Sequence, residues 1–129
     1  MYVIRRVWET KPREARRAAS IIAEAGPGEN LASSSDQQRG FALVDCREQD
    51  EYDICRIEGA RLIPLSTFVF EAEKKIPDKN LPVIVYCHHG MRSSQAVTFL
   101  RKKGYPKAFS MSGGIEAWSE EIDPSVPKY

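Results

Sequence analysis

Short, uninterrupted apolar runs recur along the chain, with more polar segments between them. Residues 41–44 and 82–86 are such runs, residues 61–63 hold a shorter one after Arg61, and residues 107–111 form a mixed segment with Ala108 and Phe109 at its centre. Continuous apolar runs of this length, bounded by polar residues and prolines, are typical of strands that are covered on both faces. We therefore predict strands over these four ranges.

A second pattern, apolar residues three or four positions apart, predicts helices between the strands. It is found over residues 12–25, from about residue 92 to residue 103, and in a short stretch at 115–119. Ser66 is placed to cap a further helix that runs to about Lys75. Strands that alternate with helices predict an α/β fold built on a parallel sheet.

The chain has the length of one domain. Its 129 residues include 42% hydrophobic and 29% charged residues, which are ordinary values for a globular protein. We place the core at about residues 41–119 and a C-terminal extension at 120–129. Residues 26–40 are rich in small and polar residues and have little to bury, so we predict a mobile loop there.

Charge and cysteine content narrow the classes of function. Nineteen Lys and Arg residues against eighteen Asp and Glu residues leave a net charge of +1, which argues against bulk nucleic-acid binding. Three cysteines, none in a C-x-x-C pair, argue against a disulfide framework. No apolar run is long enough for a signal peptide or a membrane span. We expect a cytoplasmic protein that binds neither membrane nor nucleic acid.

One polar segment between a predicted strand and a predicted helix carries a chemical signal. It reads Cys87-His88-His89-Gly90-Met91-Arg92. A tight loop with a glycine can turn successive N–H groups inward, which makes an anion-binding nest that the helix dipole reinforces. These donors and the Arg92 guanidinium favour thiolate over thiol at Cys87. His88 and His89 can add donors around the same cavity.

A cysteine at the end of a buried strand is more often a small hydrophobic residue than a nucleophile. Here the compact order of strand, cysteine, glycine-containing loop, arginine and helix favours a nucleophile. Chemistry that fits such a thiolate includes attack on sulfane sulfur or on phosphorus.

Two charged residues, Asp45 and Arg47, follow the run at 41–44 and should lie near the same crevice, because parallel strands end at one edge of the sheet. Asp45 could pin the Arg92 side chain or accept loop N–H groups, and it could equally cap the turn after its strand. For Arg47 we favour a structural role, pairing with Glu51 four residues further on.

The segment 85–93 resembles the active-site loop of single-domain rhodaneses, a family of sulfurtransferases. Other family motifs are similar and occur in the expected order: Leu43-Val44-Asp45-Cys46-Arg47, Glu51-Tyr52, Gly59-Ala60, Ile63-Pro64 and Gly113-Gly114-Ile115-Glu116-Ala117-Trp118. The chain departs at Cys55-Arg56-Ile57, where many rhodaneses read Gly-His-Ile. The resemblance implies the rhodanese-like fold, a five-stranded parallel sheet with helices on both faces.

The resemblance also implies a persulfide mechanism. Cys87 would take sulfane sulfur from a donor such as thiosulfate and pass it to a thiol, to cyanide or to a protein acceptor. The N–H groups of residues 88–92 would cradle the outer sulfur, and Arg92 would help to hold a small anionic donor. Neither a metal ion nor an organic cofactor is implied. The tail at 122–129 is similar to tails of rhodanese domains fused to adenylyltransferases, which makes a sulfur-carrier protein a candidate acceptor.

Two alternatives stay open. A phosphatase or arsenate reductase could use the same nest, but the related phosphatases have a seven-residue Cys-x5-Arg loop, and Cys87 to Arg92 counts six residues. A rhodanese module for binding or sensing, without activity, is the other alternative, and an intact Cys87 weighs against it. Cys46 and Cys55 are candidates to resolve a Cys87 persulfide as a disulfide, although a buried free thiol is the simpler expectation for both.

Overall fold

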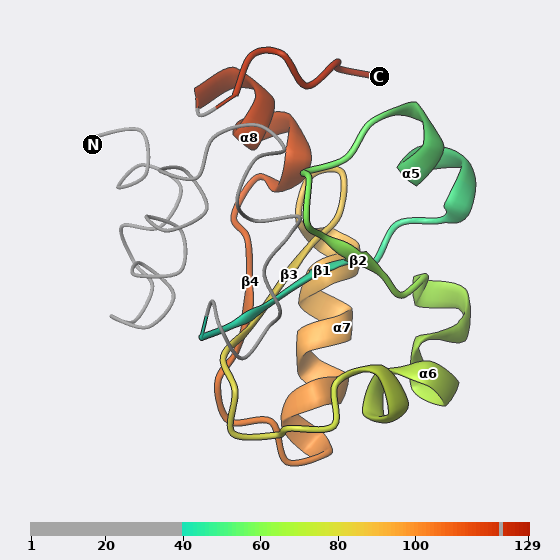
Figure 1. Cartoon of the computed structure of the whole chain (residues 1–129), viewed down its shortest axis with the longest axis vertical. Helices are drawn as coiled ribbons and strands as arrows, with labels where there is room; N and C mark the ends of the chain where they lie inside the picture. The colour runs from blue at the N-terminus through green and yellow to red at the C-terminus, as the bar shows by residue number, and fades with distance from the viewer. Residues whose placement is uncertain (1–39, 122) are drawn as a thin grey trace.

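The computed structural model describes residues 40–121 and 123–129 of the chain. Within them a four-stranded parallel sheet has the strand order β2-β1-β3-β4 (Figure 1). The predicted helix at 12–25 and all but the last residue of the predicted loop at 26–40 lie outside the described residues. The elements are β1 (Ala42–Asp45), α5 (Gln49–Ile54), β2 (Arg61–Leu62), the 3-10 helix η1 (Leu65–Thr67), α6 (Phe68–Lys75), β3 (Val83–Tyr86), α7 (Met91–Lys102), β4 (Ala108–Ser110) and α8 (Gly114–Glu121).

The parallel α/β fold predicted from the alternating pattern is confirmed, and each of the four predicted strands is present. The two central strands, β1 and β3, are buried at every residue, which explains their continuous apolar sequences. They pair in parallel register, with Asp45 opposite Tyr86. The prediction of five strands is not matched, because the part of the chain that the structure describes forms four.

Helices cover both faces of the sheet, as predicted. Successive strand residues point to opposite faces, so β3 contributes Ile84 and Tyr86 to one buried cluster and Val83 and Val85 to the other. We call the cluster that includes residues of α8 the α8-side core and the cluster that includes residues of α6 and α7 the α7-side core. Figure 1 shows α7 lying across one face of the sheet, with α6 near its lower end.

One helix was not predicted from the sequence, and one predicted helix cap is wrong. Helix α5 was not predicted because its sequence is polar and none of its residues is buried, so it has no apolar periodicity. Its first turn is held instead by the Glu48 N–H, which donates to Glu51 Oε1 at 3.2 Å. Ser66 does not cap α6: it lies within η1, and its hydroxyl donates to Glu48 Oε1 at 2.7 Å.

The predicted helix from about residue 92 corresponds to α7, and the predicted short helix at 115–119 corresponds to α8. Among the helices that the structure describes, none combines the length and the apolar character needed to cross a membrane.

Candidate active site

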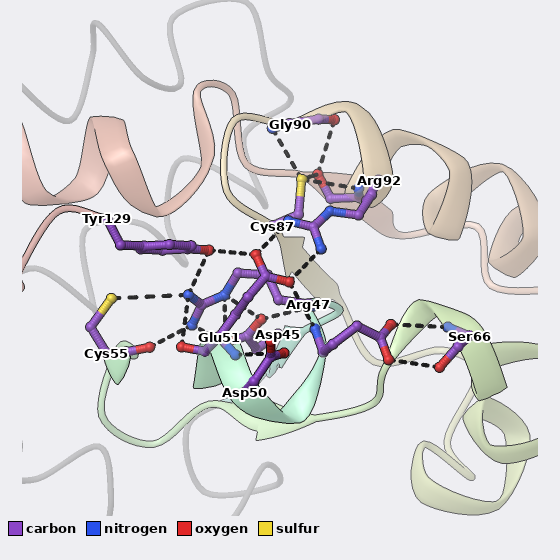
Figure 2. A network of polar contacts seen from close by, with 12 residues as sticks. Asp45, Arg47, Asp50, Glu51, Cys55, Ser66, Cys87, Gly90, Arg92 and Tyr129 are labelled. Atoms are coloured by element: carbon purple, nitrogen blue, oxygen red, sulfur yellow. Dashed lines mark hydrogen bonds and ion pairs between the residues drawn. The ribbon is translucent and has the colours of Figure 1, made fainter. Parts of the chain in front are cut away.

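Cys87 directly follows β3, where the chain enters the loop that leads to α7 (Figure 2). The residue is 1% exposed. Its Sγ accepts hydrogen bonds from the Gly90 N–H at 3.1 Å and the Ser93 N–H at 3.4 Å, and it lies 3.5 Å from Ser93 Oγ. The loop therefore wraps polar groups around one sulfur atom. Among the N–H groups of residues 88–92 that were predicted as donors, that of Gly90 donates to the sulfur. The second donor, the N–H of Ser93, lies one residue beyond the predicted range.

The shape of the loop depends on α8. The first N–H groups of this helix donate to loop carbonyls, Ile115 to Cys87 at 2.9 Å and Glu116 to His88 at 3.2 Å. These bonds hold the Cys87 and His88 carbonyl oxygens toward α8, on the other side from the sulfur's donors. Gly90, at φ +120°, then lets the chain turn so that its own N–H reaches the sulfur.

Cys87 has an acidic thiol. The neighbouring Cys46 thiol is the largest cause, and the hydroxyl and N–H of Ser93 and the N–H of Gly90 act in the same direction. Together they outweigh burial, which opposes the charge, and lower the pKa of Cys87 to about 4. Cys87 is therefore a thiolate at neutral pH. Cys46, the strongest of these influences, is not among the causes that the loop sequence predicts.

Arg92 is paired with Glu51 of α5. Its Nη1 donates to Glu51 Oε1 at 2.6 Å and its Nη2 to Oε2 at 2.8 Å, a two-pronged ion pair. These bonds to Arg92 are the main reason that the pKa of Glu51 falls to about 2. Of the alternatives for Asp45, pinning Arg92 is wrong, because Glu51 does so, whereas capping the turn after β1 is confirmed: Asp45 Oδ1 accepts the Arg47 N–H at 3.0 Å.

Asp45 and Arg47 form a second ion pair beneath the first, with both side chains completely buried. Arg47 Nη2 lies 2.6 Å from Asp45 Oδ2, and its Nε lies 2.9 Å from Oδ1. The expected pairing of the Arg47 and Glu51 side chains is wrong, since Arg47 reaches only the Glu51 backbone carbonyl, at 3.3 Å. A further bond to the Cys55 carbonyl, at 2.6 Å, ties Arg47 to the chain after α5.

Tyr129 joins the two ion pairs, as Figure 2 shows. Its hydroxyl accepts from Arg47 Nη1 at 2.9 Å and donates to Glu51 Oε2 at 2.8 Å. Its ring stacks on His88, with 4.0 Å between the ring centroids. Tyr129 and Glu51 were both missed as site residues. Glu51 was noted within a family motif, whereas no local pattern points to Tyr129, whose partners are far away in the sequence.

The two histidines of the loop face Glu116 of α8. Their rings stack at 4.0 Å, and His88 Nε2 and His89 Nε2 lie 3.6 and 3.4 Å from the Glu116 carboxylate oxygens. The three side chains could supply ligand atoms within 4.8 Å of one another. However, the rings are within 17° of parallel, so their nitrogen lone pairs do not converge on one point. Binding a single metal ion would require at least one ring to leave the stack.

Met91 begins α7 and is 79% exposed, so its side chain points away from the sulfur. Around the site the charges largely cancel: Arg92 is paired with Glu51, and Arg47 with Asp45. Arg92, the cation that the sequence places beside the thiol, is therefore already neutralised, and the attraction for an anion must come mainly from the N–H groups that face Cys87.

Comparisons with known proteins all point to one family. The family model described as "Rhodanese-like domain" matches residues 29–121. The chain is 38% identical over 117 residues to the probable adenylyltransferase/sulfurtransferase MoeZ of Mycobacterium tuberculosis, covering 86% of this chain and 30% of that protein. It is 35% identical over 100 residues to the adenylyltransferase and sulfurtransferase MOCS3 of Drosophila sechellia, covering 72% of this chain and 22% of that protein. The chain thus spans less than a third of these curated relatives.

Solved structures of similar fold are closer to this chain in length. A rhodanese-related protein from Thermoplasma volcanium has a TM-score of 0.58 at 30% identity, covering 74% of this chain and 92% of that one. The human single-domain sulfurtransferase TSTD1 has a TM-score of 0.57 at 26% identity, covering 64% of this chain and 83% of that one.

Proposed function

The chain belongs to the rhodanese-like domain family, and we propose that it is a sulfurtransferase that carries sulfane sulfur as a persulfide on Cys87. One observation carries this proposal: the Cys87 sulfur is buried at the end of β3 and accepts hydrogen bonds from two N–H groups, those of Gly90 and Ser93. A sulfur atom added to Cys87 would have the same kind of surroundings, because it too is an anion that accepts hydrogen bonds.

The reaction consists of two displacements at sulfur. In the first, the Cys87 thiolate attacks the sulfane sulfur of the donor, whose own S–S bond breaks, and sulfite leaves when the donor is thiosulfate. The negative charge then lies on the outer sulfur of the persulfide, where the loop donors stabilise it. In the second, the acceptor attacks that outer sulfur and Cys87 leaves as a thiolate. The lowered pKa of Cys87 favours this step, because a more acidic thiol is a better leaving group.

The acceptor that we propose is a sulfur-carrier protein, with small thiols or cyanide as substitutes. The support comes from relatives whose names combine an adenylyltransferase with a sulfurtransferase. We also propose that the domain works in a reducing, cytoplasmic environment. The three thiols of the chain support this proposal, since all of them are free.

Phosphoryl transfer is supported less well by the same site. A phosphatase of this loop type needs a guanidinium beside the nest to bind phosphate, and here Arg92 is engaged by the Glu51 carboxylate. A purely binding role would leave the acidity of Cys87 without a purpose. A phosphatase and a purely binding module would each give a different result from a sulfurtransferase in the following experiment.

The test is intact-mass spectrometry after incubation with thiosulfate and removal of the excess donor without reductant. We expect the mass of one added sulfur, located on the peptide that contains Cys87, and no addition in Cys87→Ala. Addition of cyanide should remove the sulfur and produce thiocyanate. A wild-type protein that stays unmodified and forms no thiocyanate would refute the sulfurtransferase proposal, and release of phosphate from a phosphoester would support the phosphatase instead.

A further inference from the structure

Cys46 lies beside Cys87, each of them directly after one of two neighbouring strands. Asp45 of β1 pairs with Tyr86 of β3, and the Cys46 N–H donates to the Tyr86 carbonyl at 3.0 Å. The residue directly after each of these strands is a cysteine. Cys46 and Cys87 therefore occupy adjacent positions at the same edge of the sheet. Paired strands lie about 4.8 Å apart, within the range of about 4.4–6.8 Å that separates the Cα atoms of disulfide-bonded cysteines.

The two side chains also point the same way. Both are members of the α7-side core, and both are buried. The closeness of the two thiols also shows in their acidity: Cys87 raises the pKa of Cys46 far above its usual value, and Cys46 lowers the pKa of Cys87. The nucleophile therefore has a protonated thiol as its immediate neighbour.

The third cysteine of the chain is placed differently. Cys55 belongs to the α8-side core, on the opposite face of the sheet, and its Sγ lies 4.0 Å from Arg47 Nη1. It cannot approach Cys87 without crossing the sheet. The chain thus holds one thiol that can react with Cys87 and one buried thiol that serves as a control.

We propose that Cys46 is a resolving thiol that converts the Cys87 persulfide into a Cys46–Cys87 disulfide and releases hydrosulfide. This inference rests on the proposed function, because it needs a persulfide on Cys87. The Cys46 sulfur attacks the inner sulfur of the persulfide, a new S–S bond forms, and the bond to the outer sulfur breaks. The Cys46 proton passes to the departing sulfur.

The step is balanced in atoms, charge and electrons. A persulfide anion and a thiol give a disulfide and a hydrosulfide anion, so the sulfane sulfur is reduced to sulfide while the two cysteine sulfurs are oxidised. No free Cys46 thiolate is required, because its proton leaves with the product. The disulfide stops further turnover until a dithiol reductant restores both thiols. When an acceptor is present, the domain transfers the sulfur. When none is present, it releases one sulfide, and the disulfide then blocks Cys87.

The experiment follows the persulfide over time without an acceptor. Each protein is loaded with thiosulfate and freed of donor, then sampled for intact mass and for sulfide. In the wild type and in Cys55→Ala, we expect the added sulfur to disappear, the mass to fall two hydrogens below the reduced protein, and one equivalent of sulfide to appear. In Cys46→Ala, the persulfide should persist at least tenfold longer, without sulfide, and should still pass its sulfur to cyanide. Peptide mapping should place the disulfide between Cys46 and Cys87.

The two proposals fail in different ways. A persulfide that forms but decays equally in the wild type and in Cys46→Ala would overturn the resolving role and leave the sulfurtransferase proposal intact. No persulfide in any variant, including Cys46→Ala, would refute the sulfurtransferase proposal itself. A mild thiol oxidant without any sulfur donor gives an independent check, since the wild type and Cys55→Ala should then form the same disulfide. Failure to form it would show that the two thiols cannot meet.

Discussion

Glu51 holds both terminal nitrogens of Arg92, with N–O distances of 2.6 and 2.8 Å. The arginine nearest to the reactive sulfur in the sequence is therefore neutralised by a carboxylate from a different helix. Because the pair occupies Arg92, breaking it should add a free cation to the attraction that the loop N–H groups already exert on an anionic sulfur donor.

Glu51→Gln should increase the preference for anionic donors. The substitution removes one negative charge and leaves the charge of Arg92 uncompensated, which at a partly exposed site is worth about 1 kcal/mol. We expect KM for thiosulfate to fall by about two- to fivefold, while KM for an uncharged persulfide donor stays the same. Steady-state kinetics with both donors would check this. Glu73→Gln, which breaks the exposed pair with Lys79, is the control. Equal changes for both donors would contradict the assignment.

The same carboxylate should contribute to stability in a pH-dependent way. The pKa of Glu51 is lowered to about 2, chiefly by Arg92, so its contribution is fully present above its unfolded pKa of about 4.3. It is lost as the pH falls from about 5 toward 2. We expect Glu51→Gln to lower the free energy of unfolding by about 1 kcal/mol at pH 7 and by much less at pH 3. Urea unfolding at the two pH values measures the difference, and an equal loss at both would count against it.

The reactivity of Cys87 should be nearly independent of pH across the neutral range. Its lowered pKa means that the thiolate is already the main form at pH 6, and raising the pH to 9 adds little more. The rate of Cys87 alkylation by iodoacetamide should therefore stay within about twofold between pH 6 and pH 9. Cys46→Ala removes the largest cause of the shift and should move the midpoint upward, more than Ser93→Ala does. A wild-type rate that rises tenfold per pH unit up to pH 8 would show an ordinary thiol.

Gly114→Ala should damage the active-site loop from a distance in the sequence. Gly114 has φ +61°, and a Cβ there would lie 2.4 Å from the carbonyl oxygens of both Cys87 and His88. We expect a loss of more than about 2 kcal/mol in unfolding free energy together with slower alkylation of Cys87. Gly104→Ala is the matched control, with φ +95° but no contact closer than 3.7 Å. If both variants lose the same stability, the close approach to the loop is unimportant.

Arg47→Met should be strongly destabilising because it leaves the Asp45 carboxylate buried without its partner. Breaking a buried ion pair on one side costs about 3–5 kcal/mol. The double variant Asp45→Asn with Arg47→Met should recover part of this loss. Urea unfolding compares the variants, and Lys79→Met, in an exposed pair, should cost less than about 1 kcal/mol. A small effect of Arg47→Met would mean that water reaches Asp45.

The parts of the fold that the sequence predicts correctly are those set by burial. Strands β1 and β3 are buried at every residue, and a run of apolar residues is enough to identify them. Helix α5 was not predicted, because none of its apolar residues is buried. Hydrogen bonds of Glu48 and Glu51 fix its first turn instead. Hydrogen bonds between polar side chains leave no periodic pattern in a sequence.

In the active site, too, some features could be predicted from the sequence and others could not. The loop from Cys87 to Arg92 is local and could be predicted from its residue order. Arg92 and Glu51 come from elements that only the fold brings together, and so do Arg47 and Tyr129, which is the clearest case. A net charge of +1 likewise says nothing about which arginines are already paired.

The bonds from α8 to the loop have a consequence for the order in which the protein is made. During synthesis Cys87 emerges before Ile115 and Glu116, whose N–H groups fix the carbonyls of Cys87 and His88. Until α8 has left the ribosome and docked, the loop lacks these bonds and the thiol lacks its fixed donors. We therefore expect the lowered pKa of Cys87 to be established only once α8 has docked against the loop.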